Sequence, residues 1–204
     1  MRAGVLALWT DVSNAGGAVG FVPPVTREDV RPGMDRSLAD VAAGRRRLLV
    51  GRDGEGRIVA TAFLAFNSHR LMHHWIWLYT VMVHPDQQGR GHGRVLMSAV
   101  EQAARDLPGI EAVRLTCRGG TGVERFYEAC GYKEVGRVPG AIRVAPGDDR
   151  DDIIMLLTLP WPASGKAAPP GTARLAPGGS PFPGRGLAQR SAAPHQGHGG
   201  SPCE

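Results

Sequence analysis

The chain has 204 residues, which is room for one ordinary domain or for one domain with an appendage. It carries 24 basic and 19 acidic residues, but shows no Lys/Arg stripe with interleaved aromatic residues, so we expect no nucleic-acid partner. Three cysteines at unrelated spacings indicate neither a disulfide framework nor a zinc site. The longest apolar run, 58–66, is too short to span a membrane, and no signal-peptide pattern opens the chain. These features predict a cytoplasmic protein without membrane contact.

Two helices are predicted at the start of the chain. The spacing of apolar residues over 3–12 favours a first helix. The glycine-rich stretch 14–24 that follows cannot stay helical. Thr26, followed by acidic residues, has the character of an N-cap. We expect the second helix to break at Pro32 and to run on to about residue 43.

The elements that follow alternate between strands and helices. In chain order we expect strands over 47–52, 57–67 and 74–83, a helix over 93–107, a strand over 112–117, a helix over 123–130, and strands over 133–138 and 153–159. Between the last two strands, 139–152 is predicted to be an acidic, glycine-bearing loop. This order indicates an α/β (α+β) fold with a mixed sheet.

The composition changes at residue 160. From there to residue 204 the chain has nine prolines and nine glycines, and few large apolar residues. Such a segment cannot bury enough apolar surface to offset the entropy lost on ordering. We therefore predict a folded domain over 1–159 and a disordered Pro/Gly-rich tail over 160–204.

A glycine-rich segment after the third expected strand has the character of a phosphate-binding turn. Gly89, Gly91 and Gly93 lack a Cβ, so the backbone can approach a ligand closely, and the helix that follows begins with unpaired N–H groups. Arg90 and Arg94 can add full charges beside a pyrophosphate. The spacing matches neither the Walker loop nor the dinucleotide fingerprint. The alternative is a glycine-rich turn that merely starts a helix.

The same segment resembles the acetyl-CoA-binding motif of the GNAT superfamily of acyl-CoA N-acyltransferases. The family pattern is Q/R-x-x-G-x-G/A after a hydrophobic strand ending V-x-P. It is met by Val83-His84-Pro85 and by Gln88-Gly89-Arg90-Gly91-His92-Gly93. Downstream, the segment 126–132 (FYEACGY) is similar to a second family signature. The resemblance implies the GNAT fold over about 5–159: a central mixed, mostly antiparallel sheet with a splayed strand pair and flanking helices.

The resemblance also implies acetyl-CoA as co-substrate. The strand ending at Val83 should splay from the strand beginning near Ala112, which would admit the pantetheine arm. The cofactor-binding residues that the resemblance implies are Val81, Met82, Val83, Gln88, Gly89, Arg90, Gly91, His92, Gly93, Arg94 and Tyr127.

Acetyl transfer to an amine needs a neutral nucleophile, an oxyanion stabiliser and a proton for the departing thiolate. By resemblance, Tyr127 has the position of the general acid, and the N–H of Met82 or Val83 is the oxyanion donor. The alternative for Tyr127 is a ring that only packs between its helix and the sheet.

Two positions depart from the family pattern. Trp77 stands where several members carry a glutamate base, and Gly120 stands where many carry an asparagine. The proton acceptor therefore stays open between water, an amine that enters neutral, and His73 or His74. These histidines and His69 have no carboxylate or cysteine at useful spacing, so no metal is expected.

The acceptor site of this family is formed by the connection between the first two helices and the loop between the last two strands. Here these segments are 14–24 and 139–152. In the second, Asp148 and Asp149, together with Asp151 and Asp152, would attract a cationic acceptor. A solvated acidic turn is the alternative.

Trp75, Trp77 and Tyr79 alternate along one strand face and are candidates to line the acceptor pocket, although core packing is more common for such residues. The stretch 16–21 resembles a small-molecule branch of the family that includes the tabtoxin-resistance enzyme. That branch has acidic residues at the positions of Trp77 and Thr116, so its substrate is not carried over.

The sequence thus predicts an acetyl-CoA-dependent N-acetyltransferase that moves an acetyl group to a primary amine of a small molecule, by direct attack in a ternary complex. The alternatives are a protein or peptide amine acetyltransferase and a non-catalytic CoA-binding module. The oligomeric state stays open, with a homodimer as one alternative. Family members normally begin with a strand before the first helix, so either the start of this chain is misplaced or that strand is absent.

Overall fold

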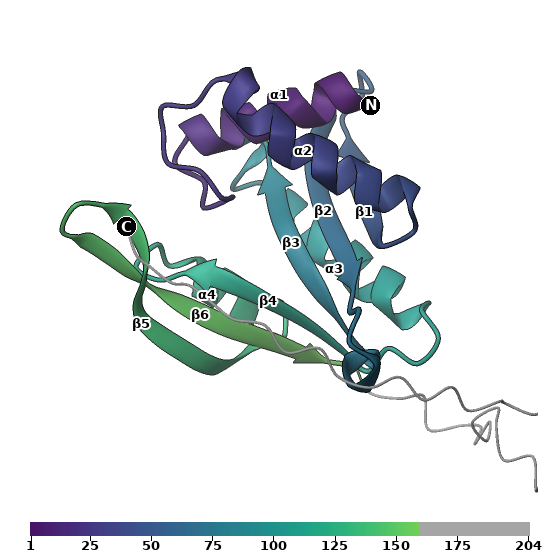
Figure 1. Ribbon diagram of the computed structural model, residues 1–204. Coiled ribbons are helices and arrows are strands. Elements are labelled where there is room, and N and C mark those ends of the chain that lie inside the picture. The colour runs from purple at the N-terminus through teal and green to yellow at the C-terminus, as the bar shows by residue number, and fades with distance from the viewer. Residues whose placement is uncertain (160–204) are drawn as a thin grey trace, which may run out of the picture. The chain divides into compact units, whose positions relative to one another are not determined.

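Six strands form one sheet in the computed structural model, which describes residues 1–159 (Figure 1). The elements are α1 (Arg2–Asn14), α2 (Arg27–Ala42), β1 (Arg46–Arg52), β2 (Ile58–Phe66), β3 (Trp75–Val83), α3 (His92–Arg105), β4 (Ala112–Arg118), α4 (Val123–Glu128), β5 (Lys133–Ala145) and β6 (Asp148–Thr158). Short 3₁₀ turns precede β3 and α3. The predicted fold class and element order are confirmed. The predicted tail over 160–204 lies outside the described residues.

The strand order is β1-β2-β3-β4-β6-β5, and every neighbouring pair is antiparallel except β3 with β4. In the described part of the chain no strand precedes α1, and β1 pairs with β2 alone. No helix within residues 1–159 combines the length and the apolar character needed to cross a bilayer.

The helix α2 begins with a capping box. The Thr26 hydroxyl accepts a hydrogen bond from the Asp29 N–H at 3.3 Å, and the Asp29 carboxylate accepts one from the Thr26 N–H at 2.8 Å. The predicted break at Pro32 is wrong, because α2 continues through that residue. A proline removes one backbone hydrogen bond, whereas Val30 and Met34 on either side are buried. Tertiary packing therefore holds the helix together.

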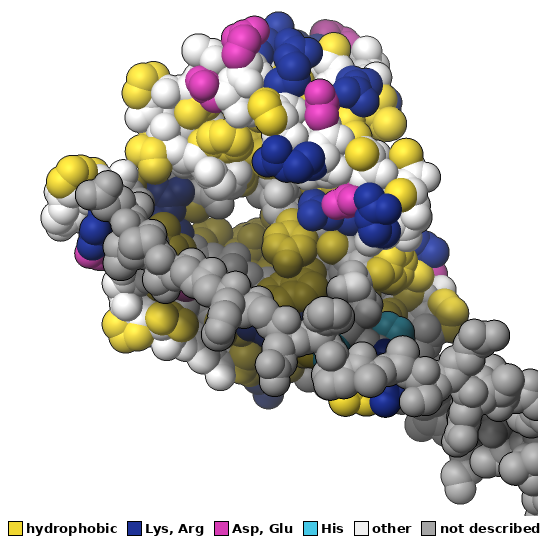
Figure 2. Space-filling model, viewed as in Figure 1, with side chains coloured by type: hydrophobic (Ala, Val, Ile, Leu, Met, Phe, Trp, Pro, Cys, Tyr) yellow, Lys and Arg dark blue, Asp and Glu magenta, His cyan; other side chains and the backbone are white. Residues whose placement is uncertain are grey.

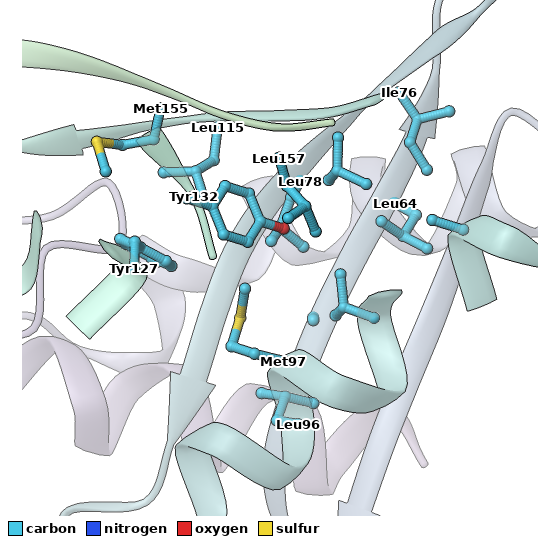
Figure 3. Packing of buried hydrophobic residues seen from close by; sticks show 14 of the residues in the cluster. Leu64, Ile76, Leu78, Leu96, Met97, Leu115, Tyr127, Tyr132, Met155 and Leu157 are labelled. Carbon is cyan, nitrogen blue, oxygen red and sulfur yellow. The ribbon is translucent and has the colours of Figure 1, made fainter. Parts of the chain in front are cut away.

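The sheet lies between two apolar clusters. On one face, α1 and α2 pack against β2 and the end of β3, with Leu8, Trp9, Val30, Met34, Phe63 and Met82 buried. On the other face, α3 and α4 pack against β2, β3, β4 and β6, as Figure 3 shows for Leu64, Leu78, Met97, Leu115, Tyr132 and Met155. Each fully buried side chain of this size stabilises the fold by about 1.5–3 kcal/mol. Because β3 carries residues of both clusters, it is anchored from both sides.

The predicted loop over 139–152 is wrong, since most of it belongs to the long β5–β6 hairpin. Ion pairs cross between the two strands: the Arg143 Nε lies 2.7 Å from an oxygen of Asp149, and the Arg137 Nη1 lies 2.9 Å from an oxygen of Asp151. Opposite charges on facing strands stabilise a sheet. The charged composition that indicated a loop is therefore a cross-strand pattern.

The sheet splits between β3 and β4. These parallel strands pair only over Trp75–Trp77 and Ala112–Arg114, and then diverge. Figure 1 shows the resulting wedge between β3 on one side and β4 with the β5–β6 hairpin on the other. The splay expected for a strand ending at Val83 is present.

Candidate active site

A cavity of about 1270 Å³ opens where β3 and β4 diverge. Ordinary ligand sites measure about 300–1,000 Å³, so this cavity has room for more than one small molecule. Figure 2 shows the hollow in this face of the molecule, with hydrophobic side chains at its base. Two groups can be distinguished among the residues that line it. The "α3 side" consists of Gln88, Gly89, Gly91, Gly93, Arg94, Val123, Phe126 and Tyr127, and the "loop side" of 15–22, Thr116, Arg118, 142–144 and Asp152.

The turn into α3 has the features expected of an anion site on the α3 side. Gly91 is the N-cap of α3 with a φ of 87°, and no side chain caps the helix there. A residue with a Cβ would be strained at that φ, although a Cβ would meet no atom within 4 Å. Gly91, Gly93 and Arg94 line the cavity, so the uncapped start of α3 borders it. This arrangement fits a diphosphate group.

Two further contacts hold that turn in place. The Gln88 side-chain amide donates to the Val83 carbonyl at 2.9 Å, which ties the turn to the end of β3. A Cβ at Gly93 would lie 3.2 Å from the ring of Phe126, so glycine allows α3 and α4 to approach each other. Most of the cofactor-binding residues implied by the resemblance line the cavity: Val81, Val83, Gln88, Gly89, Gly91, Gly93, Arg94 and Tyr127. Met82, Arg90 and His92 are not among the lining residues.

A β-bulge in β3 exposes backbone groups at the mouth of the split. Tyr79 pairs with Phe63, and Met82 pairs with Thr61, so two residues of β3 oppose one of β2. One of them, Thr80, has a φ of 51°, which is uncommon for a residue other than glycine. A bulge leaves ladder groups unpaired. The Met82 side chain is buried beneath α1, so only its backbone is available for the oxyanion role predicted from sequence.

The Tyr127 side chain is held rigidly and lines the cavity. Its ring makes edge contacts with Phe126 at 5.3 Å and with Tyr132 at 5.8 Å between centroids. Burial raises the pKa of the Tyr127 phenol well above its usual value. The phenol therefore stays protonated at neutral pH and can donate a hydrogen bond. It cannot serve as a base there.

The aromatic residues of β3 form a stacked row on the face of the sheet that carries α1 and α2. Trp77 stacks on Trp75 and on Tyr79, with centroids 6.0 and 5.6 Å apart. The Arg114 guanidinium lies 4.2 Å from the Trp77 ring centroid, and that of Arg46 lies 5.5 Å from the Tyr79 ring. Tyr79 lines the cavity, whereas Trp77 does not. Burial raises the pKa of Tyr79.

Two of the four aspartates predicted to attract the acceptor, Asp148 and Asp149, lie in the hairpin, outside the cavity lining. Asp149 pairs with Arg143, and Asp148 pairs with Arg150. Hydrogen bonds from these guanidinium groups hold the pKa of each carboxyl below its usual value. Their charges are therefore offset within the hairpin, and an acceptor role for them stays a prediction.

The histidines considered as bases lie away from the cavity. His74 directly precedes β3, and six residues of strand, or about 20 Å, separate it from the bulge at Thr80. His73 contributes to a separate small pocket with Asn67 and Pro108. Neither histidine named as a possible base lines the cavity, and of the four aspartates expected to attract the acceptor only Asp152 does.

Several lining residues were missed because no motif marks them. Thr80, Thr116, Arg118 and Thr121 line the cavity, as does the segment 142–144. The only sequence signal was alternation in the strand over 112–117, which places every second side chain on the face away from α3. The position of the hairpin strand could not be inferred, since 142–144 was expected in a loop.

The chain matches the model of the acetyltransferase (GNAT) family over residues 20–132, more than half of its length, and it belongs to that family. Solved structures share the fold. A protein assigned as a phosphinothricin N-acetyltransferase is 20% identical with a TM-score of 0.62, covering 76% of this chain and 91% of its own. Ribosomal-protein-alanine N-acetyltransferase from Brucella melitensis is 20% identical, with a TM-score of 0.61 and coverage of 78% and 94%. The yncA protein of Salmonella typhimurium, assigned as an acetyltransferase and solved with its cofactor acetyl-CoA, is 19% identical, with a TM-score of 0.63 and coverage of 82% and 93%.

Proposed function

We propose that the chain is an acetyl-CoA-dependent N-acetyltransferase that acetylates a primary amine of a small molecule by direct attack. The observation that supports this function is the single cavity that joins an anion-binding helix start, a protonated tyrosine and a separate loop-lined side. Acetyl-CoA supplies an activated acetyl thioester when it is bound. The α3 side fits its diphosphate through Gly91 and Arg94.

The residues at the split have distinct roles in this proposal. The backbone N–H of Val81, in the β3 bulge, and that of Met82 or Val83 beside it are the donors for the charge that develops on the acetyl oxygen. The Tyr127 hydroxyl donates its proton to the sulfur of the departing thiolate. Its high pKa keeps that proton in place until the sulfur carries charge. The chain thus contributes by positioning the reacting groups and by stabilising the charges that develop on the acetyl oxygen and on the sulfur.

The loop side favours a small acceptor over a folded protein. Asn14 joins the two ends of the α1–α2 connection. Its side-chain amide donates to the Val25 carbonyl and its side-chain carbonyl accepts from the Val25 N–H, both at 2.9 Å. The Trp9 indole N–H donates to the Val19 carbonyl at 3.0 Å. This fixed connection and the β5–β6 hairpin both line the cavity, which narrows access to it.

Calorimetric titration with acetyl-CoA tests the cofactor site. We expect saturable binding by the wild type and its loss in Gly91→Glu, which places a carboxylate at the anion site. Gly44→Glu is the matched control, since Gly44 also has a positive φ, 72°, and a Cβ there would meet no atom within 4 Å. Arg94→Glu also makes the turn more negative, without altering a glycine.

An amine panel with detection of free CoA tests the transfer. Amine-dependent CoA release supports the proposed function. A folded wild type that does not bind acetyl-CoA, or that binds it and acetylates no amine, contradicts it. In the second case the chain would be a CoA-binding module.

A further inference from the structure

We propose that the acceptor is a free α-amino acid with an apolar side chain, held by Arg118 at its carboxylate and by Asp152 at its amino group. This inference rests on the proposed function and names the substrate class of the same cavity. Its evidence is which charged residues line the loop side, and which of them have an ion-pair partner.

Only four charged side chains line the cavity within the described residues, namely Arg94, Arg118, Arg143 and Asp152. Arg94 lies at the start of α3, on the α3 side. Arg143 is engaged twice by Asp149, at 2.7 and 2.8 Å, so its charge is offset. This leaves Arg118 and Asp152 as one positive and one negative group on the loop side.

Arg118 and Asp152 are direct partners across β4 and β6. Directly opposed residues of antiparallel strands have Cα atoms about 4.5–5.5 Å apart, so the two side chains rise from neighbouring points of one face. Within residues 1–159 neither makes an ion pair at 4 Å or less, with the other or with any other residue. The pKa of Asp148 is lowered mainly by its hydrogen bond with Arg150, to which it is paired, and to a smaller extent by the charge of Arg118.

The backbone around the two charges is fixed. The Gly119 N–H donates to the Asp151 carbonyl at 2.8 Å, and the Thr121 hydroxyl donates to the Arg118 carbonyl at 2.9 Å. Both side chains are half-buried. Holding a partly desolvated charge without a partner costs free energy, and a bound ligand of opposite charge removes that cost. The two groups therefore form a prepared receptor for opposite charges.

The ligand that completes this receptor carries an ammonium and a carboxylate separated by a single carbon, as an α-amino acid does. A polyamine would bring two or more cations to one carboxylate. A plain alkylamine or a peptide N-terminus would leave Arg118 without an anion. The rest of the loop side is largely apolar, with Phe21, Val22, Ile142 and Val144, which favours an apolar side chain on the acceptor.

Matched acceptor series test the inference. The first compares L-leucine with L-leucinamide and 3-methylbutylamine, and the second compares L-phenylalanine with its amide and 2-phenylethylamine. A charge-assisted contact from arginine predicts that kcat/KM for the free acid exceeds that for the amide and the amine by about 10- to 100-fold. Titration of the same compounds into CoA-saturated protein gives a readout independent of turnover, and the free acid should bind most tightly.

Two variants assign the preference to its residues. In Arg118→Gln the advantage of the free acid should disappear, while the rates with the amide and the amine change little. In Asp152→Asn the KM of all three compounds should rise. Arg57→Gln removes an exposed arginine of the β1–β2 turn and should leave the preference intact.

The outcomes separate the two proposals. If acetyl-CoA binds and amides or plain amines are acetylated as well as the free acids, the amino-acid inference is wrong and the proposed function stands. Equal losses on all acceptors in Arg118→Gln would also overturn the inference. If no amine of any kind is acetylated, the proposed function fails and this inference fails with it.

Discussion

The two sides of the cavity are built in different ways. The α3 side comes largely from one contiguous turn, 88–94, and one short helix, so that its proposed anion site depends on local backbone geometry. The loop side is assembled from the α1–α2 connection, the end of β4 and the β5–β6 hairpin, which are distant in sequence. A site of the first kind can be recognised by a motif. A site of the second kind depends on strand register and ion pairing, and it can change its ligand without changing the fold.

The largest effect that separates the two sides is expected at Tyr127. Tyr127→Phe keeps the ring contacts with Phe126 and Tyr132 but removes the proton donor. We expect kcat to fall by about 100-fold or more, with acetyl-CoA affinity unchanged, in steady-state and calorimetric assays. The matched control is Tyr132→Phe. The Tyr132 hydroxyl is buried, has no hydrogen-bond partner among the described residues and lies among aliphatic side chains (Figure 3). That control should keep its activity and gain stability, and a full-rate Tyr127→Phe would show that this phenol is not the acid.

A smaller effect, confined to the loop side, is expected at Asn14. Asn14→Ala removes both hydrogen bonds to Val25, each contributing about 1 kcal/mol, and frees the connection that walls the acceptor. The acceptor KM should rise severalfold, while the Kd of acetyl-CoA stays constant. Asn14→Asp keeps the acceptor of the Val25 N–H and should give an intermediate KM. Equal weakening of acetyl-CoA would mean that the two sides are not independent.

The smallest effect is expected from the ion pairs of the hairpin. The hydrogen bond from Arg143 lowers the pKa of Asp149 in the folded protein, so the stability that this carboxylate contributes is present above its unfolded pKa, about 4. It is lost as the pH falls through the lower, folded pKa. Asp149→Asn should therefore lower Tm by a few degrees at most at pH 6, and the difference should vanish near pH 2.

Thermal scans of both proteins across this pH range check the sign. Glu111→Gln, at a residue without an ion pair among those described, is the control. A Tm difference that grows on acidification would contradict the assigned pairing. If the KM of the acceptor is unchanged in Asp149→Asn but raised in Asp152→Asn, the acceptor binds at the carboxylate of Asp152, which lines the cavity.

The sequence by itself determined the element order, the Thr26 cap, the glycine-rich turn before α3 and the family. Each depends on neighbouring residues: apolar periodicity, a capping side chain, or glycines that allow a positive φ at the start of a helix. These are local constraints, so they can be inferred without knowledge of the rest of the chain.

Only the tertiary structure decided the continuity of α2 through Pro32, the length of the β5–β6 hairpin and the composition of the loop side. Burial on either side of the proline outweighs one lost hydrogen bond. Cross-strand partners neutralise charges that indicate a loop when they are considered alone. Arg118 and Asp152 stand far apart in the chain, and strand register makes them neighbours. These features depend on pairing between residues that are distant in the chain, so they cannot be inferred from any short segment of the sequence.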